Sequence, residues 1–416
     1  MRCPACGRVH PAGTALCATG CGALLRSEYE AQGFRPRDRN DLFKFLDWLP
    51  PARAVETPIG PAVYRSERLA ARLSLDELYV GLNGYAPERG ARNPTGSFKD
   101  FEALPTLLHF RERGLQSIIL ASAGNTARAF AHAATILDFL AYLVVPEGML
   151  DRLWLPIRSS DAVRLIVIDE SRDYAAAIEL AARLSVQFGI PPEGGARNVA
   201  RREGMGTAVL EHARVVGRLP RHYVQAVGSG TGAIAAWEAA LRLRQSGQVP
   251  GELPVLHLAQ NAPFAPIHDA WTRGTPIRPH EDVPGQLARI DRITADVLAN
   301  RNPPFAVCGG VGDALRATDG TTHAVTNEEI AVARRLFEET EGIPIGTAAG
   351  AAVAALGQAL AGGRMSRDES VLLHITGNDD ALLRRDYALH PIQPWLRLRT
   401  DDLAPERIAR LADRFA

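Results

Sequence analysis

The sequence lacks the features that mark several classes of protein. It has no apolar run of membrane-spanning length, so a transmembrane role is not expected. Its 47 basic and 47 acidic side chains balance, and a nucleic-acid-binding role therefore has no electrostatic support. Internal repeats and low-complexity segments are also missing. At 416 residues the chain exceeds what one core usually supports, so we expect two domains.

Cysteine is scarce and is concentrated near the start of the sequence. Four of the five cysteines lie in the first 21 residues, as the close pairs Cys3/Cys6 and Cys17/Cys21. Paired thiolates beside glycine-containing turns suit a tetrahedral zinc ion in a ribbon, with His10 as an alternative ligand. Disulfides and unliganded thiols are the competing explanations, but no secretory leader is seen and the remaining chain has the character of a cytoplasmic enzyme. The sequence thus predicts a structural zinc ribbon.

Strand-like and helix-like segments alternate along the rest of the chain, which is typical of parallel sheets wrapped by helices. We therefore expect an α/β protein with two parallel-sheet domains. The strands expected in the smaller sheet are 115–121, 141–145 and 163–169, and those expected in the larger sheet are 223–227, 255–260 and 371–375. The expected division is a zinc-ribbon-like segment at 1–27, a large domain at 28–102 and 196–398, a small domain at 103–195 and a helical tail at 399–416.

Lys99 stands out because of its setting, Asn93-Pro94-Thr95-Gly96-Ser97-Phe98-Lys99-Asp100. Pro94 and Gly96 predict a turn after the strand-like run 78–82, and Ser97 is a candidate N-cap for the helix that follows. A lysine in the first helical turn meets the positive end of the helix dipole, which disfavours the ammonium form and favours a nucleophilic amine. A solvated lysine at the start of a helix is the simpler alternative.

Two glycine-containing loops have the character of anion-binding sites. The first, Ser122-Ala123-Gly124-Asn125-Thr126, joins a strand-like run to a helix, so its N–H groups and hydroxyls suit a carboxylate. The second, Gly228-Ser229-Gly230-Thr231-Gly232, lies in a similar place, where main-chain donors and the helix dipole bind a phosphate. It lacks the spacing of a dinucleotide fingerprint and the Lys-Ser/Thr pair of a nucleotide P-loop. Each loop, taken alone, is also explained as a tight turn.

The order of a lysine helix, an asparagine-containing loop and a phosphate cup resembles the fold type II family of pyridoxal-phosphate enzymes, which has the tryptophan synthase β fold. The resemblance covers about 41–387 and extends to the lysine motif of threonine synthases. It implies pyridoxal 5′-phosphate as the cofactor, with Lys99 as its imine-forming residue and general base. By the same resemblance Asn125 would bond the 3′-oxygen and 228–232 would hold the phosphate. Thr376, in His374-Ile375-Thr376-Gly377-Asn378, resembles the hydroxyl that faces the pyridine nitrogen, which favours elimination and replacement over transamination.

The resemblance also implies residues for the anionic groups of a substrate. The loop residues Ser122, Ala123, Gly124 and Thr126 would hold its carboxylate. Arg201 lies in 198–204, a segment that resembles the threonine synthase stretch whose arginine serves a substrate phosphate. Arg128 is a further candidate, because displacing phosphate by an anion requires fixed positive charge near the β carbon. An ordinary surface position is the alternative for both arginines.

Three segments, 192–202, 225–232 and 300–304, resemble cysteate synthases, which replace the phosphate of O-phosphoserine with sulfite. After Lys99-Asp100 this chain also has Phe101-Glu102-Ala103 where threonine synthases usually have Arg-Gly. The resemblance implies β-replacement on a phosphorylated amino acid by a small anionic nucleophile, in a cytoplasmic homo-oligomer without nucleic-acid or membrane partners. The alternatives are a threonine synthase acting on O-phosphohomoserine with water, a related biosynthetic enzyme with another nucleophile or leaving group, and a non-enzymatic zinc-binding regulatory protein.

Overall fold

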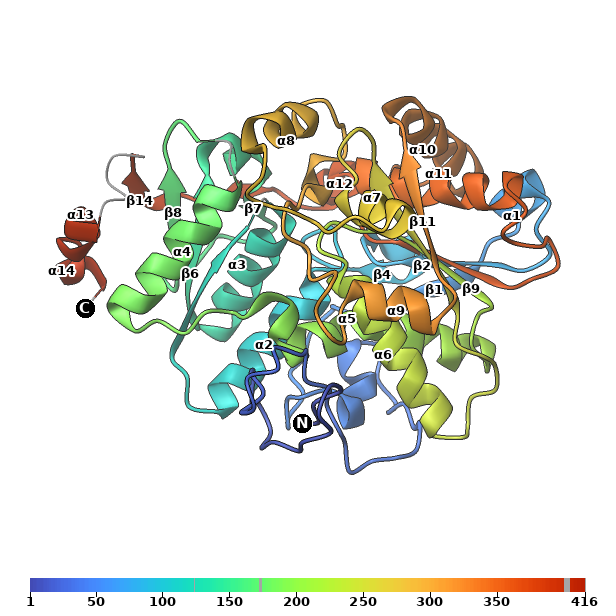
Figure 1. Ribbon diagram of the computed structural model, residues 1–416, viewed down its shortest axis with the longest axis horizontal. Coiled ribbons are helices and arrows are strands. Elements are labelled where there is room, and N and C mark those ends of the chain that lie inside the picture. Colours follow the sequence, from blue (N-terminus) through green and yellow to red (C-terminus); the bar gives the residue numbers. More distant parts are fainter. Residues whose placement is uncertain (123, 172–173, 400–404, 416) are drawn as a thin grey trace.

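A computed structural model of the chain describes residues 1–122, 124–171, 174–399 and 405–415 (Figure 1). Its larger sheet has six strands in the order β1-β2-β12-β9-β10-β11. The first two, β1 (Val63–Arg65) and β2 (Leu78–Leu82), are antiparallel to each other. The others run parallel to β2 and to one another: β12 (Val371–Ile375), β9 (His222–Ala226), β10 (Val255–Asn261) and β11 (Thr321–Val325). The strands expected near 223–227, 255–260 and 371–375 are thus confirmed in this sheet.

The smaller sheet has four parallel strands in the order β14-β8-β6-β5. They are β14 (Pro394–Leu398), β8 (Val163–Ile168), β6 (Leu140–Pro146) and β5 (Ser117–Ala121). Two short antiparallel pairs complete the strands of the described residues: β3 (Tyr85–Ala86) with β4 (Ala91–Arg92), and β7 (Trp154–Leu155) with β13 (His390–Pro391). The expected α/β architecture with two parallel sheets is therefore confirmed.

Helices cover both sheets on both faces (Figure 1). The large sheet lies between a layer with α10 (Asn327–Glu341) and α11 (Thr347–Ala361) and a layer with α5 (Val199–Val216), α6 (Thr231–Gln245) and α9 (Val311–Ala317). The small sheet lies between α3 (Asn125–Leu137), backed by α2 (Asp100–Glu112), and α4 (Tyr174–Phe188). The other α-helices that precede the C-terminal segment 405–415 are α1 (Arg68–Leu73), α7 (Pro266–Arg273), α8 (Val283–Ile290) and α12 (Ala381–Asp386). Short 3-10 turns occur at η1 (Leu42–Trp48), η2 (Pro87–Arg89), η3 (Glu147–Arg152), η4 (Gly195–Arg197) and η5 (Asp296–Leu298).

The apolar strands follow from this double coverage. Ile118 and Leu120 of β5 pack with α3, whereas Ile119 between them packs with α4. In β12 the same alternation places Leu372 with the α5 and α6 layer and Leu373 with the α10 and α11 layer. Because successive side chains point to opposite faces of a strand, a strand buried on both faces is apolar at most of its positions.

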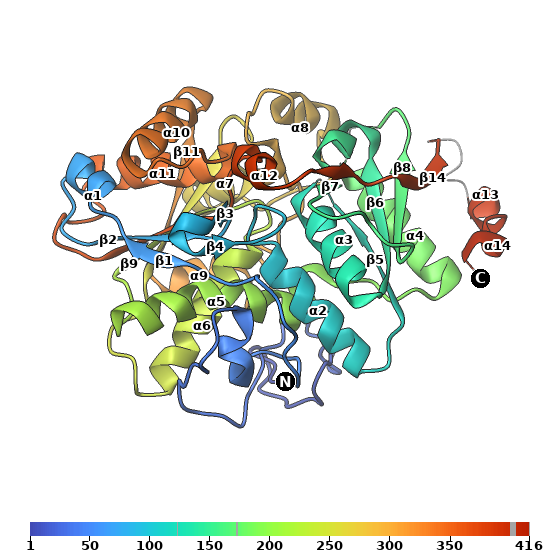
Figure 2. The same cartoon turned by 180° about the vertical axis from the view of Figure 1, so that it is seen from behind.

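The chain ends lie on different parts of the fold. Residues 1–27 pack beside α5 and α6, far from the C-terminal helices α13 (Pro405–Ala409) and α14 (Ala412–Phe415) (Figure 2). Phe415 of α14 stacks on Phe188 of α4, with 4.3 Å between the ring centroids. Part of the expected tail, 400–404 and 416, lies outside the described residues.

The strand β14 differs from the expected domain division. The boundary at 398 assigns 394–398 to the large domain, yet this strand pairs in parallel with β8 of the smaller sheet. The chain must cross back after β12 for this pairing, which a linear division of the sequence does not anticipate. The division into domains otherwise stays a prediction. Within the described residues, we find no helix that is both long and apolar enough to cross a membrane.

Candidate active site

A cavity of about 1190 Å³ lies between the two parallel sheets. Its wall includes Ala121 at the end of β5, Ala226 at the end of β9 and Thr376 directly after β12. Ligands of open parallel α/β sheets bind at these carboxyl ends, where loops rather than strands supply the side chains. The cavity is large enough for a cofactor together with a small substrate.

The cavity brings together almost all the residues predicted for catalysis and binding. Its wall contains Lys99, Ser122, Gly124, Asn125, Thr126, Arg128, Arg201, Gly228, Ser229, Gly230, Thr231, Gly232 and Thr376. Ala123, also predicted for the substrate carboxylate, lies outside the described residues. Segments separated by up to 277 positions, from Lys99 to Thr376, thus meet at one site, while the part that each residue plays there stays a prediction.

The lysine turn has a different cap from the one expected. Lys99 itself is the N-cap of α2, and the expected cap, Ser97, lies two residues earlier with its Oγ 3.4 Å from the Lys99 N–H. Asp100 closes the turn instead, because its carboxylate accepts hydrogen bonds from the N–H and the hydroxyl of Thr95 at 3.0 and 2.9 Å. Burial raises the pKa of Asp100 to about 7. Gly96 permits the turn through its positive φ of 70°.

The amine of Lys99 belongs to a buried network of charges. Its Nζ lies 3.3 Å from Oε2 of Glu102, one turn along α2. The other carboxylate oxygen of Glu102 lies 3.4 Å from the guanidinium of Arg201, which also binds both oxygens of Glu193 at 2.9 Å. Burial lowers the pKa of Lys99, and the charge of Glu102 opposes that shift. Two cations and two carboxylates therefore neutralise one another on this wall.

Arg128 occupies the opposite kind of environment. Its guanidinium donates to Oδ1 of Asn125 at 2.9 Å and to the carbonyl of Arg152 at 3.1 Å, and it lies 4.0 Å above the ring of Trp154. Among the described residues, no carboxylate lies within 4.0 Å of it, and its Nε has no hydrogen-bond partner. Burial lowers the pKa of Arg128 to about 10, which leaves it charged at neutral pH. Asp100 and Asp380 act on this charge from beyond ion-pair distance, so the site holds a buried cation without a carboxylate in direct contact.

The loop that contains Asn125 is held by its own serine. Oγ of Ser122 accepts hydrogen bonds from the N–H groups of Gly124 and Ala127, at 3.1 and 2.9 Å. Gly124 has a φ of 139°, a backbone angle that residues other than glycine rarely adopt. Asn125 and Thr126 are therefore presented to the cavity at the start of α3, where main-chain N–H groups are free of helical partners.

The phosphate cup joins β9 to α6. Gly230 is the N-cap of α6 with a φ of 78°, and any Cβ at this position would collide with Val311. A Cβ at Gly232 would lie 2.5 Å from Nε2 of Gln225, so a larger residue there would have to displace the end of this side chain. The hydroxyls of Ser229 and Thr231 lie 2.9 Å apart beside the first turn of this 15-residue helix. This set of hydroxyls and helix N-terminal donors is well suited to a phosphate group.

Thr376 is tied to the lysine turn. It is buried, and its carbonyl accepts a hydrogen bond from the N–H of Phe98 at 2.9 Å. Two residues earlier, His374 bonds the hydroxyl of Tyr223 at 2.6 Å and the amide of Asn83 at 2.8 Å. Burial lowers the pKa of His374 to about 3, so the ring is neutral at physiological pH. This histidine holds the strand end in place.

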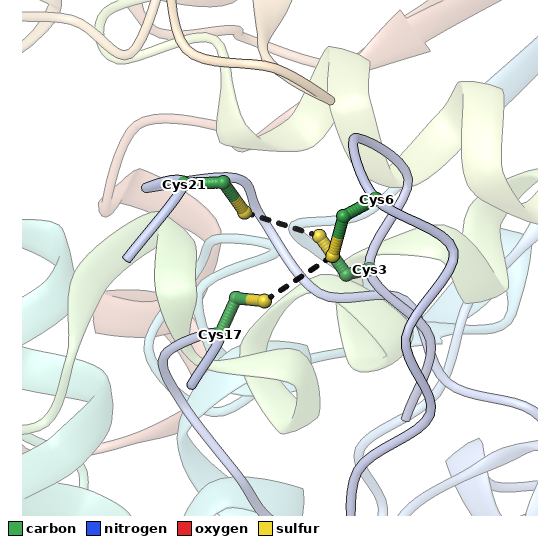
Figure 3. Close-up of side chains that lie close together, drawn as sticks. All are labelled: Cys3, Cys6, Cys17 and Cys21. Atoms are coloured by element: carbon green, nitrogen blue, oxygen red, sulfur yellow. Dashed lines mark hydrogen bonds between the residues drawn. The ribbon is translucent and has the colours of Figure 1, made fainter. Parts of the chain in front are cut away.

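The four N-terminal cysteines form a separate cluster (Figure 3). Their Sγ atoms point toward one another and all lie within 4.8 Å of each other, with Cys3 and Cys21 at 3.3 Å and Cys6 and Cys17 at 3.6 Å. The thiols are free, and His10 is not part of the group. Tetrahedral zinc bound by four thiolates at about 2.3 Å places sulfurs roughly 3.8 Å apart, so the cluster fits this ion. The metal itself remains a prediction.

Comparison with known proteins agrees with this geometry. The family model described as "Pyridoxal-phosphate dependent enzyme" matches residues 61–377. The chain belongs to this family. It is 45% identical to a cysteate synthase of Methanocella paludicola over 413 residues, which cover 99% of this chain and 96% of the relative. A cysteate synthase of Methanosarcina acetivorans is 43% identical over 409 residues, 98% of each chain.

Solved structures show the same fold at low sequence identity. A serine racemase from maize superposes with a TM-score of 0.59 at 16% identity, covering 78% of this chain and 91% of that one. A fungal L-serine ammonia-lyase from Rhizomucor miehei gives a TM-score of 0.58 at 19% identity, covering 78% and 96%. This pyridoxal-phosphate dependent enzyme therefore has the fold expected from its lysine motif and its two anion loops.

The cavity of the pyridoxal-phosphate dependent enzyme fits the cofactor that the family name implies. A partly buried amine at Lys99 suits the cofactor aldehyde, and the cup at 228–232 suits its phosphate. The amide of Asn125 and the hydroxyl of Thr376 supply neutral polar groups between them. These are the groups that would hold pyridoxal 5′-phosphate here.

Three residues at the site of this pyridoxal-phosphate dependent enzyme were not identified from its sequence. Glu102 and Glu193 neutralise Lys99 and Arg201, and Trp154 stacks under Arg128. Only Glu102 carried a signal, because it replaces a glycine that threonine synthases usually have at that position. Glu193 lies on a loop eight residues before Arg201, and Trp154 lies on the short strand β7, but no spacing rule connects either residue with its cation.

Proposed function

We propose that the chain is a cysteate synthase, which converts O-phospho-L-serine and sulfite into L-cysteate and phosphate. The observation that carries the proposal is the identity of 42–45% to curated cysteate synthases over at least 98% of this chain. In this reaction the bond from Cβ to the phosphate oxygen breaks and a bond from Cβ to the sulfite sulfur forms. Sulfite supplies the electron pair and phosphate leaves with one, so no external oxidant or reductant is required.

The residues of the cavity have distinct parts in this proposal. Bound pyridoxal phosphate supplies the electron sink that acidifies the α C–H bond. Lys99 takes the α proton once its amine is free and returns it at the end, and Glu102 stabilises the ammonium in between. The neutral hydroxyl of Thr376 leaves the cofactor ring a moderate acceptor, which favours elimination and replacement. The loop at 122–126 holds the substrate carboxylate with Ser122, Gly124 and Thr126.

Arg128 is the group best suited to the substrate phosphate. It is buried, charged and without a carboxylate within 4.0 Å among the described residues, so an incoming anion meets a cation that has no direct ion pair to give up. Arg201, the other arginine predicted for the substrate, is already bound by two carboxylates. Its part in the proposal is to hold Glu102 in contact with Lys99.

A direct assay tests the proposed reaction. Enzyme reconstituted with pyridoxal phosphate is mixed with O-phosphoserine and sulfite, and phosphate release and cysteate mass are followed. A parallel sample contains O-phosphohomoserine and water, the threonine synthase substrates. We expect cysteate in the first sample and no threonine in the second. The reverse result would establish a threonine synthase. This is the second candidate because the motif at 93–100 resembles that of threonine synthases. Lys99→Ala is the control and should lose both the yellow cofactor band and turnover.

We also propose that the cysteine cluster binds zinc. The support is the mutual proximity of the four thiols and their match to the dimensions of a tetrahedral thiolate site. Zinc analysis of the purified protein by mass spectrometry tests this, with about one equivalent per chain expected and loss in Cys3→Ser. A homo-oligomeric state and a cytoplasmic location belong to the proposal as well and are tested by light scattering and cell fractionation.

A further inference from the structure

The basic side chains of the cavity divide by whether they have an acidic partner. Four have a carboxylate within 4.0 Å: Lys99, Arg152, Arg201 and Arg334. Two, Arg128 and Arg197, have none among the described residues. A cation that its own protein leaves unpaired in a cavity is ready to bind an anionic ligand. Arg128 is accounted for by the proposed phosphate site, and Arg197 is not.

Arg197 lies on a loop that is fixed at both ends. Its main-chain N–H donates to the carbonyl of Gly194, and the N–H of Gly195 donates to Oε2 of Glu193 at 3.0 Å. The loop is therefore hydrogen-bonded to the carboxylate that pairs with Arg201. Directly after it, Asn198 caps α5 by accepting from the N–H of Ala200 at 3.0 Å. The guanidinium is therefore anchored to the cavity wall rather than to a mobile surface loop.

The side chain of Arg197 is hydrogen-bonded to the cysteine ribbon. Nη1 of Arg197 donates to the carbonyl of Gly22 at 3.1 Å, and Gly22 directly follows Cys21. A second clamp is the fully buried Arg202, which donates to the carbonyl of Ala196 on the loop and to that of Leu25 on the ribbon side. A few hydrogen bonds thus connect the ribbon that contains the cysteine cluster with the cavity loop that contains Arg197.

The ribbon is also part of the cavity wall. Leu24 lines the cavity, and its N–H donates to the carbonyl of Cys308 at 2.9 Å. Cys308 in turn packs against the small apolar core of the ribbon, which consists of Cys3, Cys17, Ala23 and Leu25. A metal bound by the cysteines would therefore fix two neighbouring parts of the wall, Leu24 and Arg197.

The proposed reaction needs two anion sites in addition to those for the cofactor phosphate and the substrate carboxylate. One receives the leaving phosphate and the other receives sulfite, which adds only after phosphate has left. A second cation without a carboxylate partner lets sulfite bind in the cavity without first displacing phosphate from Arg128. Resting on the proposed function, we propose that Arg197 binds the anionic nucleophile, and that the metal-bound ribbon holds it in position. The bond to Gly22 uses one N–H of the guanidinium and leaves the others for the oxygens of sulfite.

The first test compares two KM values in the reconstituted full-length enzyme. Arg197→Gln should raise the KM for sulfite about tenfold or more, because a charge-assisted contact is lost, and should change the KM for O-phosphoserine less than about twofold. Sulfate, a non-nucleophilic analogue, should compete with sulfite in the wild type and only weakly in the variant. Arg8→Gln, an exposed arginine of the ribbon, is the matched control and should behave as wild type. An unchanged KM for sulfite, or an equal rise in both KM values, would overturn the assignment.

The second test addresses the link to the ribbon. Zinc is removed with a chelator, and zinc content, cofactor absorbance and circular dichroism are measured to show that the enzyme stays folded. Metal loss should weaken sulfate binding in the wild type and add little in Arg197→Gln, because both changes act on one group. Equal further weakening in the two proteins would show that the ribbon does not act through Arg197. Cys21→Ser provides the same comparison if chelation unfolds the protein.

The failure of this proposal differs from the failure of the proposed function. If the wild type forms no cysteate from O-phosphoserine and sulfite, the proposed function is wrong. Calorimetric binding of sulfate to wild type and Arg197→Gln then still decides the anion site, since it does not depend on turnover. Equal sulfate affinity in the two proteins overturns the site in either case.

Discussion

The two walls of the cavity differ in whether their basic side chains are paired with carboxylates. On the wall formed by α2 and α5, Lys99 and Arg201 lie against Glu102 and Glu193, and the network is buried and closed. On the wall formed by α3, Arg128 lies against an amide, a carbonyl and an aromatic ring, none of which carries a full negative charge. A buried cation with a matching carboxylate holds the protein together, whereas one without a carboxylate favours an anionic ligand.

The largest expected effect is on stability and concerns the closed wall. Arg201→Ala leaves Glu193 buried without its cation and Glu102 with Lys99 alone, which should lower the free energy of unfolding by about 3–5 kcal/mol. Urea denaturation of the holoenzyme measures this. Arg128→Ala is the matched comparison and should cost clearly less, since no buried carboxylate loses its partner. Similar losses in the two variants would remove the distinction between the walls.

The next effect is on substrate binding and concerns the open wall. Arg128→Gln should raise the KM for O-phosphoserine by roughly ten- to a hundredfold, since a charged hydrogen bond contributes about 1.5–3 kcal/mol. The KM for sulfite should change little. Steady-state kinetics with each substrate varied in turn provides the measurement. A rise confined to sulfite would exchange the assignments of Arg128 and Arg197.

A third expected effect is a shift in pH dependence caused by Glu102. Burial lowers the pKa of Lys99 and the carboxylate of Glu102 raises it, so Glu102→Gln should lower that pKa further. The neutral amine needed to bind the cofactor aldehyde then exists at lower pH. The rate at which apoenzyme regains the yellow band, recorded against pH, should therefore have its midpoint at lower pH in the variant. Glu147→Gln, a half-buried glutamate of η3 that pairs with Arg397 outside the cavity wall, should leave the midpoint unchanged.

The smallest expected effect concerns the ring under Arg128. Trp154→Leu removes a cation–π contact of 4.0 Å, which contributes about 0.5–2 kcal/mol, so the KM for O-phosphoserine should rise severalfold. Trp154→Phe keeps an aromatic ring and should recover part of the loss. If Leu and Phe are equivalent at this position, the ring acts by filling space and not through its charge distribution.

Features that depend on neighbouring residues were predicted well. The strands of both sheets, the glycine cup at 228–232 and the loop at 122–126 follow from apolar runs, glycines and helix-opening residues within a few positions of one another. The four cysteines likewise lie within 21 residues, and the structure places their sulfurs together. Local geometry decides such features, so local sequence reveals them.

Features that depend on distant residues were predicted poorly. The lysine turn is a local exception: Ser97 was a reasonable cap by residue type, but the carboxylate of Asp100, three residues later, closes the turn onto Thr95. Arg201 was assigned to a substrate anion without knowledge of Glu102, which lies 99 positions earlier in the chain. The strand β14 joins the smaller sheet only because the chain returns to it after the large sheet is complete.

The sequence by itself determined the fold class, the cofactor-binding motifs and the grouping of the cysteines, because each depends on residue order over short stretches. Only the tertiary structure decided which cations of the cavity are neutralised and which are not. Charge pairing depends on distances of about 3–4 Å between side chains from α2, α3, α5 and the loop before η4, and residue order does not fix these distances. The structure therefore separates Arg201, which is paired, from Arg128 and Arg197, which have no carboxylate within 4.0 Å in the described part of the chain.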